Sequence, residues 1–200
     1  TQMKATGEVM SIGRTFEESL LKAIRSLETG VFHLYMEKFD EKTREELLSY
    51  IKAGTDDRIF AVAQLLRLGC NVQQIAFETK IDGFFLEKMK KIIEMENMLK
   101  ANPWNRDVLH EAKRGGFSDR AVAWLWNTDE DTVFRIRKEM HLFPVYKMID
   151  TCASEFDSYV PYFYSTYEEE NESIAEDRKK ILVLGSGPIR IGQGVEFDYS

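Results

Sequence analysis

The chain contains little cysteine, no long apolar run and no excess of basic residues. Cys70 and Cys152 are its two cysteines in 200 residues, which is too few for a disulfide scaffold and indicates a reducing compartment. We expect both thiols to be packing residues. No stretch approaches the roughly 20 apolar residues that cross a membrane. These absences predict a globular, cytoplasmic protein without a membrane partner.

The negative charge is concentrated near the C-terminus. The net charge is −7, and residues 151–200 carry four basic and ten acidic side chains. The acidic run from Glu168 to Asp177 predicts a solvated linker. Because no basic surface accompanies the rest of the chain, the composition argues against nucleic acid as a partner.

Capping residues followed by apolar positions at helical spacing predict a mainly α fold. Thr15 with Glu18, and Thr43 with Glu46, have the spacing of capping boxes. Further N-caps are expected at Asn71, Asp82, Asn105, Ser118 and either Thr128 or Asp129. The predicted helix ends are Gly30, Gly54, Gly69, Asn102-Pro103 and Gly115-Gly116. The pattern is typical of short helices around a shared core.

A shift of 47 residues brings two parts of this pattern into register. It places Gly69 on Gly116, Asn71 on Ser118 and Asp82 on Asp129. The match concerns caps and apolar faces rather than residue identity, and it suggests a duplicated helical unit.

Short helices joined by glycine turns also suggest a DNA-binding helix-turn-helix. The two candidate recognition helices, residues 82–100 and 129–141, interleave acidic with basic side chains. Contact with phosphates needs a net positive face. We therefore do not expect binding to nucleic acid.

Side chains that could perform catalysis or bind a metal are scarce. His33, His110 and His141 lie far apart in the sequence and lack neighbouring cysteines at metal-ligand spacing. We expect surface or structural histidines, no catalytic residue and no metal site. Carboxylates such as Glu111 and Asp119 are expected on solvated helix faces or at caps. An aromatic run predicts an extended segment whose phenol groups reach polar partners; it comprises Phe156, Tyr159, Tyr162, Phe163, Tyr164 and Tyr167.

A glycine-rich loop near the C-terminus follows an apolar run. Residues 179–184 read as a buried parallel strand, which predicts the first strand of an α/β domain whose remainder would lie beyond Ser200. The glycines of the loop are Gly185, Gly187, Gly192 and Gly194. Their spacing fits neither a dinucleotide fingerprint nor a Walker loop. The loop either approaches a phosphate or carboxylate through its backbone or is a plain tight turn.

Several motifs together resemble carbamoyl phosphate synthase large chains. Residues 183–199, VLGSGPIRIGQGVEFDY, resemble the opening of the second synthetase half of that family. Residues 3–15, MKATGEVMSIGRT, resemble the close of the first half. Residues 144–153, PVYKMIDTCA, and 164–168, YSTYE, resemble the connecting stretch. Ala5 and Phe143 depart from the residues usual in the family, which are Ser and His.

The resemblance implies a central fragment of an enzyme that makes carbamoyl phosphate from bicarbonate, glutamine-derived ammonia and two ATP. Residues 1–27 would end the first, carboxyphosphate half, residues 28–172 would form a helical oligomerisation domain, and residues 173–200 would begin the second half. The implied fold is a multi-helix domain with a truncated first strand of an α/β pre-ATP-grasp domain. In one interpretation the chain would self-associate through its helices. In the alternative interpretation it would be a passive spacer between domains that does not self-associate.

The implied parent enzyme works with a glutaminase small subunit and serves pyrimidine and arginine synthesis. Its ATP-grasp sites hold Mg²⁺ or Mn²⁺ with ATP outside this chain, so the chain would contain no cofactor and would be inactive alone. The family conducts carbamate through a channel. On that resemblance Met3, Glu8, Gly194 and Glu196 are candidate wall residues, where a glycine leaves space and carboxylates hold polar molecules. A turn glycine and structurally paired glutamates are the alternative.

Overall fold

Eight α-helices and a two-stranded sheet make up the part of the chain that the computed structural model describes, namely residues 9–27, 29–150, 155–156, 162–174 and 176–182. In chain order the elements are α1 (Phe16–Ser26), the 3₁₀ turn η1 (Glu37–Phe39), α2 (Arg44–Tyr50), α3 (Arg58–Arg67), α4 (Val72–Thr79), α5 (Gly83–Ala101), α6 (Arg106–Arg114), α7 (Asp119–Trp126), α8 (Glu130–Glu139), β1 (Val145–Met148) and β2 (Phe163–Thr166). The predicted mainly α fold is confirmed.

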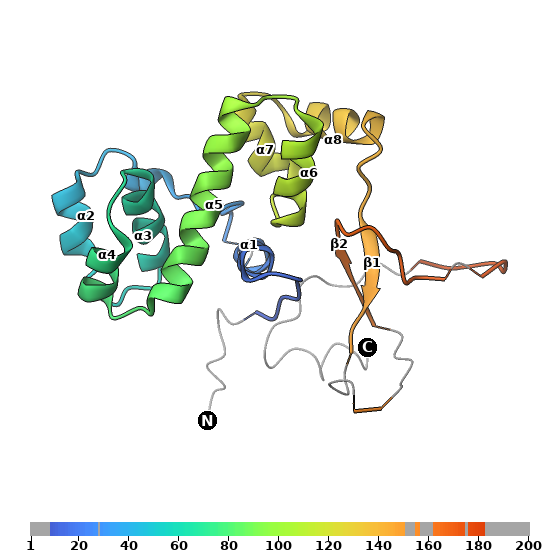
Figure 1. Cartoon of the computed structure of the whole chain (residues 1–200), viewed down its shortest axis with the longest axis horizontal. Coiled ribbons are helices and arrows are strands. Elements are labelled where there is room, and N and C mark those ends of the chain that lie inside the picture. The colour runs from blue at the N-terminus through green and yellow to red at the C-terminus, as the bar shows by residue number, and fades with distance from the viewer. Residues whose placement is uncertain (1–8, 28, 151–154, 157–161, 175, 183–200) are drawn as a thin grey trace.

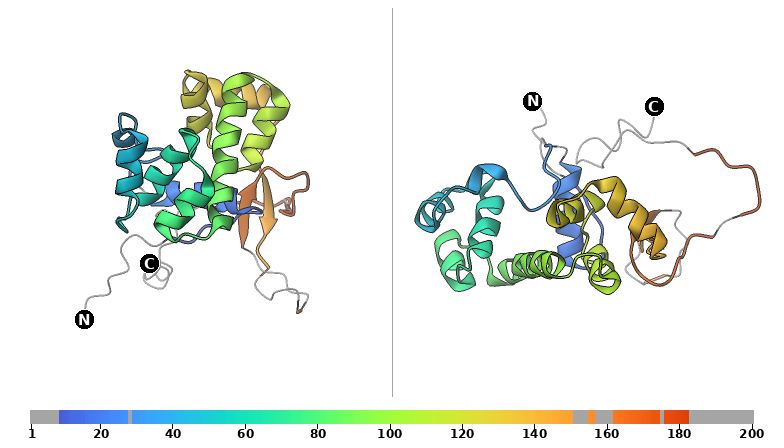
Figure 2. Two further views of the ribbon diagram at one scale, coloured as in Figure 1. Left: turned by 60° about the vertical axis from the view of Figure 1, so that its left-hand side comes forward. Right: turned by 90° about the horizontal axis from the view of Figure 1, so that it is seen from above.

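The long helix α5 is the centre of the arrangement. It contacts α1, α3, α4, α6 and α7. Helices α2 to α4 lie on one side of α5 and helices α6 to α8 on the other, while the sheet lies beyond α6 to α8 (Figure 1). The view from above shows the same separation of the two groups (Figure 2, right). The fold is therefore two groups of short helices joined by one long helix.

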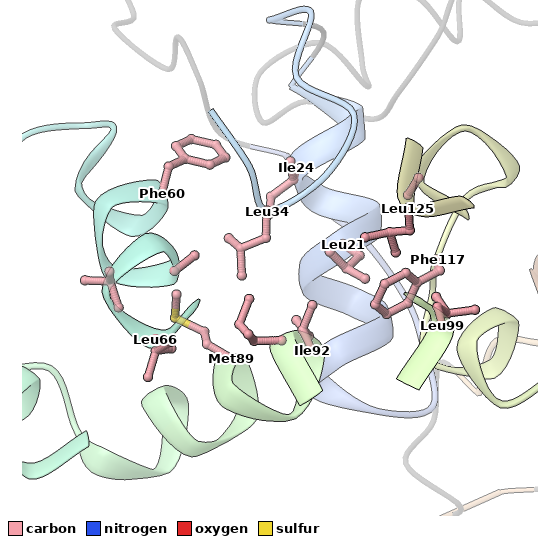
Figure 3. Close-up of a cluster of buried hydrophobic side chains, with 14 of the residues drawn as sticks. Leu21, Ile24, Leu34, Phe60, Leu66, Met89, Ile92, Leu99, Phe117 and Leu125 are labelled. Carbon is pink, nitrogen blue, oxygen red and sulfur yellow. The ribbon is translucent and has the colours of Figure 1, made fainter. Parts of the chain in front are cut away.

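One hydrophobic core runs through both groups of helices. Figure 3 shows side chains from α1, α3, α5 and α7 converging on it. The residues labelled there are Leu21, Ile24, Leu34, Phe60, Leu66, Met89, Ile92, Leu99, Phe117 and Leu125. Burying each such side chain stabilises the fold by about 1.5–3 kcal/mol before entropy is counted. Since Leu21 and Ile24 are fully or nearly fully buried, α1 packs in the same core as the other helices.

The predicted N-caps form where the sequence places them. Thr43 and Glu46 make a complete capping box. The side chains of the other predicted caps each accept a backbone N–H of the first turn, and they are Asn71, Asp82, Asn105, Ser118 and Asp129. Of the two alternatives at the last helix, Asp129 is thus the cap. Local side-chain chemistry is sufficient to start these helices.

Only one of the two hydrogen bonds of the capping box predicted at Thr15 is present. The Thr15 hydroxyl accepts the N–H of Glu18 at 3.1 Å. The Glu18 carboxylate accepts the N–H of Arg14 at 2.7 Å and pairs with Lys22 at 2.7 Å instead of returning to Thr15. Helix α1 also ends earlier than predicted, with Leu27 as its C-cap, and Gly30 adopts a positive φ of 82° beyond it.

The 47-residue correspondence extends to the backbone. Shifting α4 (Val72–Thr79) by 47 residues gives the bounds of α7 (Asp119–Trp126), and both helices end in a left-handed residue, Lys80 and Asn127. Gly69 and Gly116 both have positive φ, and in each case the two residues from the glycine onward donate to the preceding helix in a Schellman motif. The local structure of the two units therefore agrees with the predicted duplication.

The small sheet was not predicted. β1 and β2 pair antiparallel, with Val145 opposite Thr166 and Met148 opposite Phe163. Four-residue strands show too little alternation to be recognised from sequence. Part of the aromatic run is thus extended, as predicted, but as a paired strand.

The acidic run is solvent-exposed, as predicted for a linker, apart from the partly buried Glu168, and a few ion pairs hold it. Glu168 pairs with Arg114 at 3.6 Å, and Glu170 and Glu172 pair with Lys147 at 3.7 and 3.1 Å. The Glu172 carboxylate also accepts the N–H of Met148. The first of these pairs connects the run to α6, and the bonds of Glu170 and Glu172 connect it to β1.

The predicted C-terminal strand is described only over residues 179–182. These residues lie outside any sheet, and Ile181 and Leu182 are almost fully exposed. The rest of the predicted strand lies outside the described residues. A parallel strand is buried only where neighbouring strands and helices cover it, and the described part of the chain supplies none beside it.

The two corresponding glycines give a matched test of the packing between α1 and the turn that follows α6. A Cβ on Gly116 would lie 2.7 Å from the Cα of Glu18, whereas a Cβ on Gly69 would meet nothing within 4 Å. Both residues have positive φ, so alanine is strained at either position by about 1–2 kcal/mol. We expect Gly116→Ala to lower the free energy of unfolding by about 1–3 kcal/mol more than Gly69→Ala, because overpacking adds to strain. Urea denaturation measures both; equal losses would contradict the close approach.

Candidate functional site

The residues predicted to border a channel or form the glycine loop lie outside the described residues. This holds for Met3, Glu8, Gly185, Gly187, Gly192, Gly194 and Glu196. Their predicted roles are therefore untested and stay predictions. The site must be sought among the remaining side chains.

No three His, Cys, Asp or Glu side chains in the described ranges lie where they could jointly hold a metal ion. His33 is buried, whereas the partly buried His110 and the exposed His141 line the same surface pocket. Cys70 is a buried free thiol in the core, which agrees with its predicted packing role. Cys152 lies outside the described residues.

A buried ion network joins α5 to α3 and to the segment before η1. Arg67 donates two hydrogen bonds to the Glu96 carboxylate, at 2.9 and 2.7 Å, and a third to the carbonyl of Leu34 at 2.6 Å. His33 Nε2 lies 2.9 Å from Oε1 of the same carboxylate, the oxygen that also accepts from Arg67 Nη2. The Glu96 side chain is only 1% exposed. This bidentate geometry is the strongest that arginine and a carboxylate can form.

The pKa values in this network follow from burial and pairing. Burial raises the pKa of Glu96, but the bonds from Arg67 and His33 outweigh it and leave the pKa below its usual value. Burial also lowers the pKa of His33, against the opposing effect of Glu96. His33 is thus neutral at pH 7 and donates its Nε2 proton to Glu96. Its Nδ1 is buried without a hydrogen-bond partner, which costs free energy.

A second network joins α6, α7 and α8. Asp119 accepts from Lys113 at 2.8 Å and from Arg137 at 3.0 and 3.2 Å. Burial lowers the pKa of Lys113 to about 8, opposed by Asp119. Burial acts to raise the pKa of Asp119, but the two cations hold it below its usual value. Two nearly buried cations on one carboxylate leave a local excess of positive charge.

Sequence reasoning missed both networks. Asp119 was expected on a solvated helix face or at a cap, and it is instead a largely buried ion partner. Its partners Lys113 and Arg137 lie six residues before it and eighteen after it, spacings that carry no helical signal. A charged residue on an otherwise apolar helix face indicates a buried ion pair. This signal does not identify the residue with which the charge pairs.

Three exposed phenylalanines flank the turn between α4 and α5. Phe77 is 70% exposed, Phe84 57% and Phe85 44%. Phe84 and Phe85 also pack on Phe16, with ring centroids 6.3 and 5.4 Å away. We call Phe77, Phe84 and Phe85 the phenylalanine patch. Phe84 and Phe85 contact each other, whereas Phe77 lies across the turn on α4. Exposed apolar side chains on neighbouring helices are typical of an interface with another protein.

A helical body with an apolar surface patch and buried ion pairs defines a candidate assembly module. No helix in the described ranges is both long and apolar enough for a membrane span. The family model of the carbamoyl-phosphate synthetase large chain oligomerisation domain matches residues 8–141, and that of the carbamoyl phosphate synthase preATP-grasp domain matches residues 177–200. The first match covers more than half of the chain. The chain therefore belongs to the carbamoyl phosphate synthase large-chain family, as the sequence motifs predicted.

The Glu96 network yields a stability prediction. Glu96→Ala would leave Arg67 and His33 buried without their common partner, and we expect a loss of about 3–5 kcal/mol in the free energy of unfolding. Glu94 lies on the same helix with a side chain 59% exposed, so Glu94→Ala should change stability by less than about 0.5 kcal/mol. Chemical denaturation of the two variants measures the difference. A Glu96→Ala variant as stable as the Glu94→Ala control would show that the network does not hold the core.

Proposed function

We propose that this chain is the central part of the large subunit of a glutamine-hydrolysing carbamoyl phosphate synthase and that its helical domain self-associates. The observation that carries the proposal is the match of residues 8–141 to the oligomerisation domain of that family. The match of residues 177–200 to the preATP-grasp domain supports the order of domains in the parent protein. The oligomerisation domain would then include α1, because the matched range begins at residue 8 and Leu21 and Ile24 belong to the shared core. The expected division at residue 27 would move towards the N-terminus, and residues 173–200 would begin the second half.

The parent enzyme would be a cytoplasmic ATP-dependent ligase. One ATP-grasp half would phosphorylate bicarbonate, ammonia from a glutaminase small subunit would convert the product to carbamate, and the other half would phosphorylate carbamate. The product would feed pyrimidine and arginine synthesis. Mg²⁺ or Mn²⁺ would accompany ATP in those halves. Because both nucleotide sites would lie in those halves, we expect the chain alone to have no synthetase activity.

Self-association would use a surface of the helical domain, with a second copy of the chain as its occupant. The phenylalanine patch is the candidate contact, since Phe77 and Phe84 expose large aromatic surface on adjacent helices. Aromatic side chains dominate the energy of protein interfaces when they are desolvated. In a symmetric dimer the same patch would meet its own copy.

The association is measured by light scattering over a hundredfold range of chain concentration. We expect a concentration-dependent dimer, and we expect the double variant Phe77→Ser and Phe84→Ser to weaken it at least tenfold, because apolar burial at the contact is lost. Phe134→Ser is the matched control, since Phe134 is 46% exposed on α8, away from the patch. It should leave the mass distribution unchanged.

The outcomes separate the two candidate roles. A strict monomer at every concentration would favour the passive spacer, because assembly would then need surfaces elsewhere in the parent protein. A dimer that survives the double variant would retain the assembly role but exclude the phenylalanine patch as its contact. A thermal melt of each variant verifies that the fold is intact.

The channel is a further part of the proposal and is supported by sequence resemblance alone. Met3, Glu8, Gly194 and Glu196 would border the path of carbamate between the two synthetase halves. In the complete enzyme, Gly194→Leu should narrow that path and lower the amount of carbamoyl phosphate formed per ATP hydrolysed at least tenfold, a loss equivalent to about 1.4 kcal/mol. Gly194→Ala is the smaller control. Unchanged coupling in the leucine variant would remove Gly194 from the channel wall.

A further inference from the structure

The sheet and the residues after it are attached to the helices without sharing their core. None of the described residues beyond Leu142 contributes a side chain to the hydrophobic core. A cleft of about 450 Å³ lies between α1 and β2, lined by residues such as Ile12, Lys22 and Tyr164. Apolar packing therefore does not fill this junction, and other forces must hold β2 in place.

Cations from three helices contact successive residues of the segment 163–168. Lys22 of α1 donates to the carbonyl of Ser165 at 2.7 Å, and its Nζ lies 5.5 Å from the centre of the Tyr164 ring. Arg114 of α6 lies 3.6 Å from the carboxylate of Glu168. These contacts hold the segment near its start, at Tyr164 and Ser165, and at its end, at Glu168.

The ring of Tyr167 occupies the middle of this line of cations. Lys113 Nζ lies 5.0 Å from its centre and Arg137 Cζ lies 5.6 Å from it. Contacts of this kind are worth most where water is excluded, and both cations are nearly buried.

The charges around this ring favour such a contact. Asp119 faces the two cations from α7, Arg25 adds positive charge from α1, and Glu18 lies beside Arg25. Burial raises the pKa of Tyr167 to about 12, so its hydroxyl stays neutral. The negative face of the ring thus meets an excess of positive charge that Asp119 alone does not neutralise.

We propose that Lys22, Lys113, Arg114 and Arg137 form a cation clasp that docks residues 163–168 on the helical body, with the aromatic ring of Tyr167 as its central contact. Release of this segment breaks its pairing with β1 but no contact in the core of the helices, so the segment can detach without unfolding them. Electrostatic contacts near the surface weaken as salt screens them. Detachment should therefore also increase with ionic strength.

Amide hydrogen exchange of the whole 200-residue chain tests the clasp. In Tyr167→Leu, which keeps apolar bulk but removes the ring, we expect residues 163–168 to exchange about tenfold faster while the helical amides are unchanged. Tyr167→Phe keeps the ring and should restore slow exchange to within twofold of the original chain. Tyr162→Leu is the control, since Tyr162 is an exposed aromatic residue just before β2.

The outcomes decide the proposal. Fast exchange in Tyr167→Leu with rescue in Tyr167→Phe supports the ring as the central contact. Fast exchange in both variants would place the effect on the hydroxyl and overturn the proposal. Equal exchange in all variants, at 0.02 and 0.5 M salt alike, would overturn it as well, because docking would then depend on neither the ring nor charge.

A second readout rests on the proposed function. If residues 173–200 begin the second synthetase half, the clasp fixes the point from which that half leaves the helical body. In the complete enzyme, Tyr167→Leu should then lower the carbamoyl phosphate formed per ATP hydrolysed by at least threefold, and Tyr167→Phe should not. Faster exchange in the chain with unchanged coupling in the enzyme would keep the clasp but overturn its positioning role. An enzyme that makes no carbamoyl phosphate even without substitution would instead overturn the proposed function.

Discussion

A single buried carboxylate, Glu96, constrains how α3, α5 and the segment before η1 are arranged. It projects from α5 into an apolar core, a position that is costly unless the charge is fully paired. Arg67 reaches it from α3 and His33 from the segment before η1. Because a bidentate pair tolerates little displacement, these three parts of the chain have one arrangement. His33 also packs against Phe117 and Trp124, with ring centroids 4.9 and 6.0 Å away, which links the first group of helices to the second.

The two helical units share a backbone plan but differ in their charges. In the first unit, the Glu96 network is buried between α3 and α5, and its bonds join residues of the helical domain to one another. In the second unit the cations of Lys113 and Arg137 reach the ring of Tyr167 outside the core. One network thus stabilises the body, while the other is available to hold the connecting segment. Two helical units with the same backbone arrangement thus have different roles: the charged network of the first stabilises the domain, and that of the second docks the connecting segment.

The parts of the fold that could be predicted are those that depend on neighbouring residues. Asn71, Asp82, Asn105 and Ser118 cap helices because a short polar side chain satisfies an N–H two or three residues away. The partners of Glu96 are 29 and 63 residues distant, so no local pattern predicts them. The site was less predictable still. The family of the chain could be inferred from sequence motifs near its two ends and in the connecting stretch. The phenylalanine patch and the clasp could be found only in the structure, because the exposure of a side chain does not follow from its residue type.

The two proposed contacts of the domain obey different physics. The phenylalanine patch would bury apolar surface. Salts that are excluded from protein surfaces increase the stabilisation that such burial provides. The cation clasp relies on charge, which salt screens. An excluded salt such as sulfate should therefore strengthen apolar burial at Phe77 and Phe84, whereas any salt screens the partly exposed cations Lys22 and Arg114. Lys80 and Lys88 lie over the Phe77 and Phe84 rings, so a contact between two patches must also accommodate these charges. A domain that both assembles and positions a neighbouring segment benefits from this separation, since a change in one contact need not disturb the other.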